Sequence, residues 1–150
     1  MYTVVDVASY ILDEYGPLTT MRLQKLAFYS QAQFLVNHGS PIFGEDFEAW
    51  VNGPVAPQLY RLHKGKFLLH RGDLASAVEG DVPLPQCVKD EVDAVCSSLV
   101  GLTGKELSER THREDPWMDA RRGCGPSEPC RKVIHKDVMA DYYRRHPVGA

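Results

Sequence analysis

The hydrophobic and polar positions at the start of the chain predict two helices separated by a short break. Apolar residues recur at helical spacing over residues 4–15, and Thr3 in front of them is a suitable N-cap. Gly16 and Pro17 end this helix, and a second helix follows over residues 21–37. Because the second helix is apolar over most of its circumference, we expect it to lie at the centre of the fold.

Helical spacing then gives way to an extended pattern. Residues 47–51 (FEAWV) alternate apolar with small or polar side chains, which predicts a short strand, and residues 52–54 (NGP) predict a turn. Pro57 stands where helices begin, so we expect a short helix from there to about residue 64. Residues 66–81 predict a loop with a short extended piece.

The second half of the chain predicts three more helices. One covers residues 86–100 with a single apolar face, and a shorter one begins at the capping-box sequence of residues 103–106. The last covers residues 136–145. The apolar residues that we expect it to present are Val138, Met139 and Tyr142.

Loops and a strand are predicted between these helices. We expect the helix that begins near residue 103 to be followed by a loop at Pro116. Residues 123–129 also predict a loop, because they contain two glycines and two prolines. Residues 131–134 predict a second short strand. The expected fold is therefore mainly α: a compact domain of five to six helices with a small two- to three-stranded β element.

The composition is that of an ordinary globular protein. Of the 150 residues, 43% are hydrophobic and 25% charged, and a chain of this length buries a core without disulfides or metals. No internal repeat, low-complexity tract or linker divides the sequence. We therefore expect residues 1–150 to form a single domain.

The charge of the chain disfavours nucleic-acid binding. The net charge is −3, whereas proteins that bind nucleic acids usually carry a basic field that releases counterions from phosphates. One local basic patch is present, and it comprises Arg121, Arg122, Arg131 and Lys132.

The sequence predicts a cytoplasmic protein. The N-terminus lacks the basic region of a signal peptide, and no apolar run approaches the roughly 20 residues of a membrane-spanning helix. The four cysteines are then expected to be reduced thiols. We expect no cofactor, because the sequence holds no phosphate-binding loop and no G-x-S-x-G, H-E-x-x-H or C-x-x-C motif.

The spacing of the cysteines does not favour a metal site. Cys87 and Cys96 lie about 180° apart in helical projection. Cys124, Cys130 and His135 have the spacing C-x₅-C-x₄-H, which is looser than that of zinc sites and has no fourth ligand. A disulfide between Cys124 and Cys130 is geometrically possible but disfavoured in a reducing compartment.

One segment has the residue types of a catalytic site. His112 lies beside Glu114 and Asp115, and a histidine near carboxylates can act as a general base or metal ligand. No Ser, Cys or Lys partner completes a catalytic set, so we favour a structural role at a helix end with Trp117 packed nearby. A hydrolase that uses His112 and Asp115 is the less favoured alternative.

Aromatic and amide side chains form the second candidate site. Tyr29, Gln31 and Gln33 lie on the central helix, and Trp50 and Tyr60 follow it. Buried amides must be paired, so the glutamines are expected either to bond to the next loop or to line a groove. Aromatic side chains with polar groups are typical anchors of protein interfaces, although intramolecular packing is favoured for any single one.

Five short motifs follow one another between residues 22 and 117. They are a K-L-Q-K-L-like helix with Tyr-x-Gln (residues 22–31), Gly-x-Pro-Ile-Phe (39–43), F-E-A-W (47–50), G-P-V-x-P (53–57) and L-S-x-x-T-H-x-x-x-P-W (107–117). In order and spacing the chain resembles the Panacea antitoxin domain family, which includes SocA-like antitoxins and phage-associated GepA-like proteins. The motif residues are Gln24, Lys25, Gln31, Gly53, Pro54, Pro57, His112 and Pro116.

The resemblance implies a mainly α-helical, non-enzymatic antitoxin. It implies that the chain neutralises a cognate toxin by direct protein binding, and that some members of the family present the toxin to the ClpXP protease. The identity of the toxin does not carry over. A transcriptional regulator that binds its own operon is an alternative, which the acidic net charge disfavours. The expected partner-binding residues are Tyr29, Gln33, Trp50, Tyr60 and Trp117.

Two segments depart from the family pattern, namely residues 72–85 and the loop between Cys124 and Cys130. Our hypothesis is that these segments contact the specific partner.

Overall fold

The computed structural model describes residues 1–78 and 83–149. The helices within them are α1 (Val4–Tyr15), α2 (Thr20–His38), α3 (Pro57–His63), α4 (Gln86–Leu99), α5 (Gly104–His112), α6 (Asp115–Ala120) and α7 (Lys136–Arg145), with a 3₁₀ turn η1 (Ala75–Ala77). The strands are β1 (Leu18–Thr19), β2 (Phe47–Trp50), β3 (Gly53–Val55), β4 (Leu68–Leu69) and β5 (Val133–Ile134). The mainly α fold with a small β element is confirmed.

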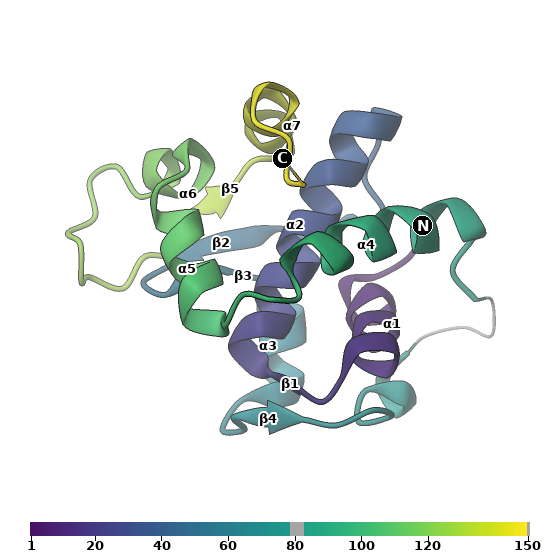
Figure 1. Cartoon of the computed structure of the whole chain (residues 1–150). Helices are drawn as coiled ribbons and strands as arrows, with labels where there is room; N and C mark the ends of the chain where they lie inside the picture. The colour runs from purple at the N-terminus through teal and green to yellow at the C-terminus, as the bar shows by residue number, and fades with distance from the viewer. Residues whose placement is uncertain (79–82, 150) are drawn as a thin grey trace.

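The long helix α2 is the centre of the fold, as its apolar circumference predicts. It contacts α1, α4, α5, α7 and β3. Figure 1 shows α1 and α4 on one side of α2 and α5 and α6 on the other, with α7 above. Twelve consecutive or nearly consecutive residues of α2 are buried, including the polar residues Gln24, Lys25 and Gln31.

Local capping signals fix the ends of the helices. The side chain of Thr3 accepts a hydrogen bond from the backbone of Asp6, whose carboxylate accepts one from the backbone of Thr3, so that a capping box begins α1. The side chain of Thr19 caps α2 by accepting a hydrogen bond from the backbone N–H of Arg22. Gly39 ends α2 with a φ of 73°, a conformation that glycine adopts without strain.

A three-stranded antiparallel sheet lies beside α2, in the order β3-β2-β5. Glu48 lies opposite Val55 and Trp50 opposite Gly53. The prediction of a turn over residues 52–54 is therefore partly wrong, because Gly53 and Pro54 belong to a strand. Pro54 is tolerated there because β3 is an edge strand and needs no N–H donor on its outer side. A second, two-stranded sheet joins β1 to β4.

Two other expectations are corrected. Pro116 does not break the chain to a loop but stands in the first turn of α6, where a helix needs no N–H donor. This raises the number of helices in the described residues to seven, above the predicted five to six. On α7, Met139 and Tyr143 are buried and Val138 is exposed, because the inward face is shifted from the predicted one. Part of the loop predicted over 66–81 lies outside the described residues.

Aromatic rings connect α2 to the sheet and to α7. The ring of Phe28 lies edge-on to that of Phe47 at 5.2 Å between centroids, and to that of Tyr143 at 6.1 Å. Edge-to-face pairs of this kind stabilise a core beyond the area that they bury. The sheet is thus held against α2, and its hairpin β2–β3 has a fixed position beside the N-terminal half of that helix.

Candidate functional site

Buried side chains of α2 hold the segments around the β2–β3 hairpin. The amide of Gln24 pairs with both backbone groups of Ala56: its Oε1 accepts from the Ala56 N–H at 2.9 Å and its Nε2 donates to the Ala56 carbonyl at 3.3 Å. Gln24 Nε2 also lies 3.0 Å from His63 Nε2. Gln24 therefore fixes the start of α3 against α2.

Gln31 performs the same role about two turns further along α2. Its Nε2 donates to the carbonyl of Phe43 at 2.7 Å, and its Oε1 accepts from the N–H of Ile42 at 2.9 Å. Of the two roles expected for Gln31 and Gln33, the structure therefore shows for Gln31 the pairing with the following loop. Buried backbone groups that lie outside regular structure are satisfied in this way.

Lys25, between these glutamines, is a buried cation. Its side chain is 1% exposed, and its Nζ donates to the carbonyl of Pro54 at 3.0 Å. None of the ion pairs among the described residues includes Lys25. Burial without a counter-ion lowers the pKa of Lys25 to about 7, because an ammonium loses its hydration there.

Two histidines face the same region. Burial lowers the pKa of His63 on α3 and of His112 on α5, and the nearby charge of Lys25 lowers both further. Both shifts favour the neutral imidazole. Lys25 is then the residue in this group whose charge changes near pH 7.

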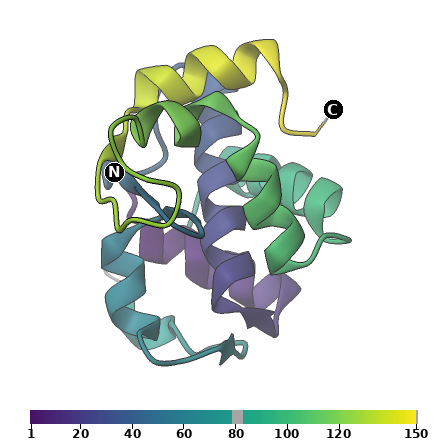
Figure 2. The same cartoon turned by 90° about the vertical axis from the view of Figure 1, so that its left-hand side faces the viewer.

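A cavity of about 340 Å³ opens beside Lys25. Figure 2 shows α3, the β2–β3 hairpin and the loop after α6 on the same face of the molecule, and residues from all three line the cavity together with the start of α2. The lining residues are Thr20, Met21, Gln24, Lys25, Trp50, Val51, Asn52, Val55, Tyr60, His63, Pro129, Cys130 and Arg131. No Asp or Glu is among these described residues.

Two of the five expected partner-binding residues line this cavity. The rings of Trp50 and Tyr60 pack edge-to-face at 4.9 Å between centroids, and both side chains remain partly exposed. The guanidinium of Arg131 lies over the Trp50 ring at 5.3 Å, and Trp50 Nε1 donates to Glu48 Oε1 at 2.8 Å. The indole is thus held in place, with part of its surface open to solvent.

The other three expected partner-binding residues lie elsewhere or are engaged internally. Tyr29 is completely buried, and its hydroxyl donates to Glu114, which also accepts from Tyr143. Burial and the Glu114 carboxylate raise the pKa of Tyr29. Gln33, one turn after Tyr29 on α2, accepts from the N–H of Val148 at 3.1 Å. Tyr29 therefore presents no surface to a partner in this conformation.

Trp117 packs behind the hairpin. Its Nε1 donates to the carbonyl of Trp50 at 2.8 Å, and its ring stacks on His112 at 4.0 Å between centroids. The Nε2 of His112 is buried and has no hydrogen-bond partner among the residues that the structure describes. The expected packing of Trp117 at this helix end is observed, and the geometry gives the hydrolase hypothesis for His112 and Asp115 no support.

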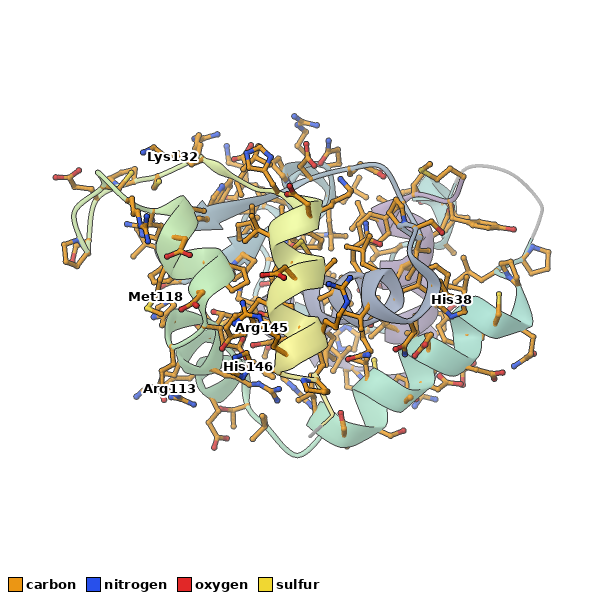
Figure 3. All side chains as sticks on the ribbon, turned by 90° about the horizontal axis from the view of Figure 1, so that it is seen from above. His38, Arg113, Met118, Lys132, Arg145 and His146 are labelled. Atoms are coloured by element: carbon orange, nitrogen blue, oxygen red, sulfur yellow. The ribbon has the colours of Figure 1, made fainter. Side chains whose placement is uncertain are left out.

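The structure changes the interpretation of the basic patch. Arg121 is buried, and its guanidinium donates to the carbonyl of Ala49 at 2.8 Å and to two carbonyls of the loop that follows α6, those of Gly125 and Glu128. Figure 3 shows Lys132 where this loop returns to the sheet. The exposed part of the patch is therefore smaller than the sequence indicates.

The cysteines are free thiols. Cys87 is exposed and Cys96 is buried, where burial raises the pKa of its thiol to about 12. The Sγ atoms of Cys124 and Cys130 lie 2.6 Å apart in the loop after α6. Residues 1–78 and 83–149 contain no group of three His, Cys, Asp or Glu side chains that is arranged to hold a metal ion.

Sequence reasoning missed Lys25 and Arg131 as parts of this site. A signal for Lys25 was present, because it stands between Leu23 and Leu26 on a helix that is apolar over most of its circumference. Arg131 gave no such signal, since its position over Trp50 depends on the path of the loop after α6.

Comparisons with known proteins agree on one family. A family profile described as "Antitoxin SocA-like, Panacea domain" matches residues 23–118, which include most of α2, the hairpin and α5. The chain is also similar to a protein named "Antitoxin SocA" from Caulobacter vibrioides (strain NA1000 / CB15N), with 28% identity over 95% of this chain and 83% of that protein. No solved structure gives a significant match. Within the described residues, no helix has the length and apolar character to cross a membrane.

Proposed function

We propose, because this chain belongs to the SocA-like Panacea antitoxin family, that it neutralises a partner toxin by binding that toxin directly. Membership of the family and the similarity to Antitoxin SocA support an antitoxin role, and an antitoxin role implies a toxin as partner. We further propose where the toxin binds and how it is neutralised.

The observation that supports a contact surface is the cavity beside Trp50 and Tyr60. Interfaces are dominated by a few aromatic residues at preformed pockets, surrounded by side chains that exclude water. Trp50 and Tyr60 are fixed by each other and by Glu48, so that binding costs little side-chain entropy. We place the centre of the toxin-binding surface on this face, with Arg131 at its edge.

The same placement makes α2 and the hairpin one rigid support. Gln24 and Lys25 both bond to the backbone that follows β2, so the cavity walls are held by α2 itself. A rigid surface of this kind binds its partner with little change in its own backbone. The complex is therefore expected to be stoichiometric.

The test is co-expression of the chain with the protein encoded beside it. We expect that the neighbouring protein alone stops growth, that co-expression restores growth, and that the two proteins co-purify in a fixed ratio. Restored growth without any complex in the purified fraction contradicts direct binding.

Delivery of the toxin to the ClpXP protease is a second mechanism of neutralisation, which the family resemblance implies for some members. It begins with the same complex but ends with loss of the toxin. The half-life of the toxin in cells with and without ClpX separates the two: an unchanged half-life supports inhibition by covering, and a longer half-life without ClpX supports delivery.

A further inference from the structure

The cavity contains a buried cation that the chain itself does not neutralise. An ammonium has three N–H donors, and Lys25 Nζ makes its one hydrogen bond within the described residues to the carbonyl of Pro54. Lysine is almost never fully buried unless it is paired. Isolated burial of this kind is unfavourable for the charged form, so the site favours any anion that enters it.

The rest of the lining has the same preference. Arg131 adds a second cation, and the described lining residues include no carboxylate, although the whole chain carries a net charge of −3. The carboxylate of Glu48 is near Trp50 but does not line the cavity, and it accepts the Trp50 N–H. The cavity is therefore a donor-rich site in an acidic protein.

The walls favour an anion that carries an apolar stem. Met21, Val51 and Val55 line the cavity together with the two aromatic rings. A free inorganic anion leaves this apolar surface uncovered, whereas methylene groups cover it and gain hydrophobic contact. A volume of about 340 Å³ is sufficient for a side chain of several heavy atoms.

We propose that an acidic side chain of the toxin, a glutamate or aspartate on an exposed segment, enters this cavity and pairs its carboxylate with Lys25. The inference rests on the proposed function for the identity of the partner as a protein. The methylene stem lies between the apolar walls, Arg131 provides the outer positive charge, and Trp50 and Tyr60 cover the backbone of the inserted segment.

The groups around Lys25 leave it as the residue that responds to such a carboxylate. His63 and His112 face it from α3 and α5, and burial lowers the pKa of each. Tyr60, Cys130 and Arg131 are the other titratable or charged side chains of the cavity, and none of them is a carboxylate. The pKa of Lys25 is itself about 7 in the free protein. A carboxylate in contact with it raises this pKa, because an opposite charge favours the ammonium.

The first experiment needs no toxin. Glutamic acid capped as its N-acetyl and N-methylamide derivative is titrated into the protein, and capped glutamine of the same shape is the control probe. A ligand of this size binds at a dissociation constant of roughly 1 mM. We expect capped glutamate to raise the pKa of Lys25, followed by the NMR shift of its Cε, by about one unit or more, and capped glutamine to leave it unchanged.

Further titrations test which part of the ligand the cavity recognises. Acetate tests a free carboxylate, and an effect of acetate equal to that of capped glutamate contradicts the role of the stem. The variant Lys25→Met is expected to lose the preference for glutamate over glutamine, as followed by the fluorescence of the two tryptophans, while the exposed Lys64→Met keeps it. Because the pKa of Lys25 is measured in the unaltered protein, the test stands even if Lys25→Met does not fold.

The second experiment uses the complex with the neighbouring gene product. We expect the pKa of Lys25 to rise in that complex and Lys25→Met to weaken binding about tenfold or more. A toxin that binds while the pKa of Lys25 stays at its free value overturns the inference but leaves the proposed function intact. If no complex forms, the proposed function fails, and the capped-residue titration still decides whether the cavity takes a carboxylate.

Discussion

Gly53 leaves open the space through which the side chain of Lys25 passes. A Cβ built on Gly53 lies 2.5 Å from Lys25 Cε and 2.9 Å from Thr111 Oγ1. Gly53 also has a φ of 112°, a conformation that residues with a Cβ rarely adopt. The sharp start of β3 and the buried position of Lys25 thus depend on the same missing side chain.

Gly53→Ala is therefore expected to lower the free energy of unfolding by about 2–4 kcal/mol, since it adds backbone strain and a contact inside the core. Gly65→Ala is the matched control, because Gly65 has a φ of 82° but open space around it. It is expected to cost about 1–2 kcal/mol from strain alone. Urea denaturation measures both, and equal losses contradict the contact with Lys25.

The titration of Lys25 makes the free energy of unfolding depend on pH. Its pKa is about 7 when folded and 10.5 in its unperturbed state, so between these values the unfolded chain binds a proton that the folded chain does not. The free energy of unfolding therefore rises with pH, by up to about 1.4 kcal/mol per pH unit. Below pH 7 both states are protonated, and the cost of the buried charge is fully present.

The comparison with Lys25→Met isolates this effect. Between pH 7 and 9, we expect the unaltered protein to gain stability relative to Lys25→Met as the pH rises, while all other titrating groups are shared. Thermal or urea unfolding at several pH values measures the difference. Parallel stability curves for the two proteins contradict a lowered pKa, and Lys64→Met is expected to run parallel to the unaltered protein.

Gln31 is expected to be a major contributor to stability. Gln31→Leu keeps the size of the side chain but leaves the Ile42 N–H and the Phe43 carbonyl, both on buried residues, without partners. We expect a loss of about 2–4 kcal/mol. The exposed Gln86→Leu is the control and is expected to change stability by less than about 0.5 kcal/mol. A similar small effect at Gln31 contradicts its role.

Much of the fold follows from local signals in the sequence. The capping boxes at Thr3 and Thr103 and the glycine stop at Gly39 involve residues within a few positions of each other, so sequence alone locates the helix ends. The central position of α2 follows from its apolar circumference. That prediction favours burial of Lys25, which lies in the most apolar part of the helix.

Two of the differences from the sequence-based expectations, those at Tyr29 and Arg121, depend on contacts between distant segments. Tyr29 was an expected partner-binding residue, but its burial depends on Glu114, 85 residues later in the chain. Gly53 and Pro54 have the composition of a turn, and only pairing with β2 makes them a strand. Arg121 is buried because it bonds to the carbonyl of Ala49, a contact that no local pattern indicates.

The thiols are expected to differ in reactivity. Cys87 is exposed, whereas Cys96 is buried and its pKa is raised to about 12. Because the thiolate is the reactive species, a thiol reagent at pH 8 should modify Cys87 before unfolding and Cys96 only after it. Mass spectrometry of peptides after timed labelling checks this order. Early labelling of Cys96 contradicts its place in the core.

Binding of the toxin by the Trp50 face is the central proposal, and calorimetric titration of the purified toxin into the antitoxin measures it. We expect a fixed stoichiometry with the unaltered protein, and a dissociation constant about 30-fold higher, or more, for Trp50→Ala. Met118→Ala, an exposed apolar residue on α6 that does not line the cavity, is expected to bind as the unaltered protein does. Equal affinity of Trp50→Ala and the unaltered protein, with both folded by circular dichroism, contradicts this account.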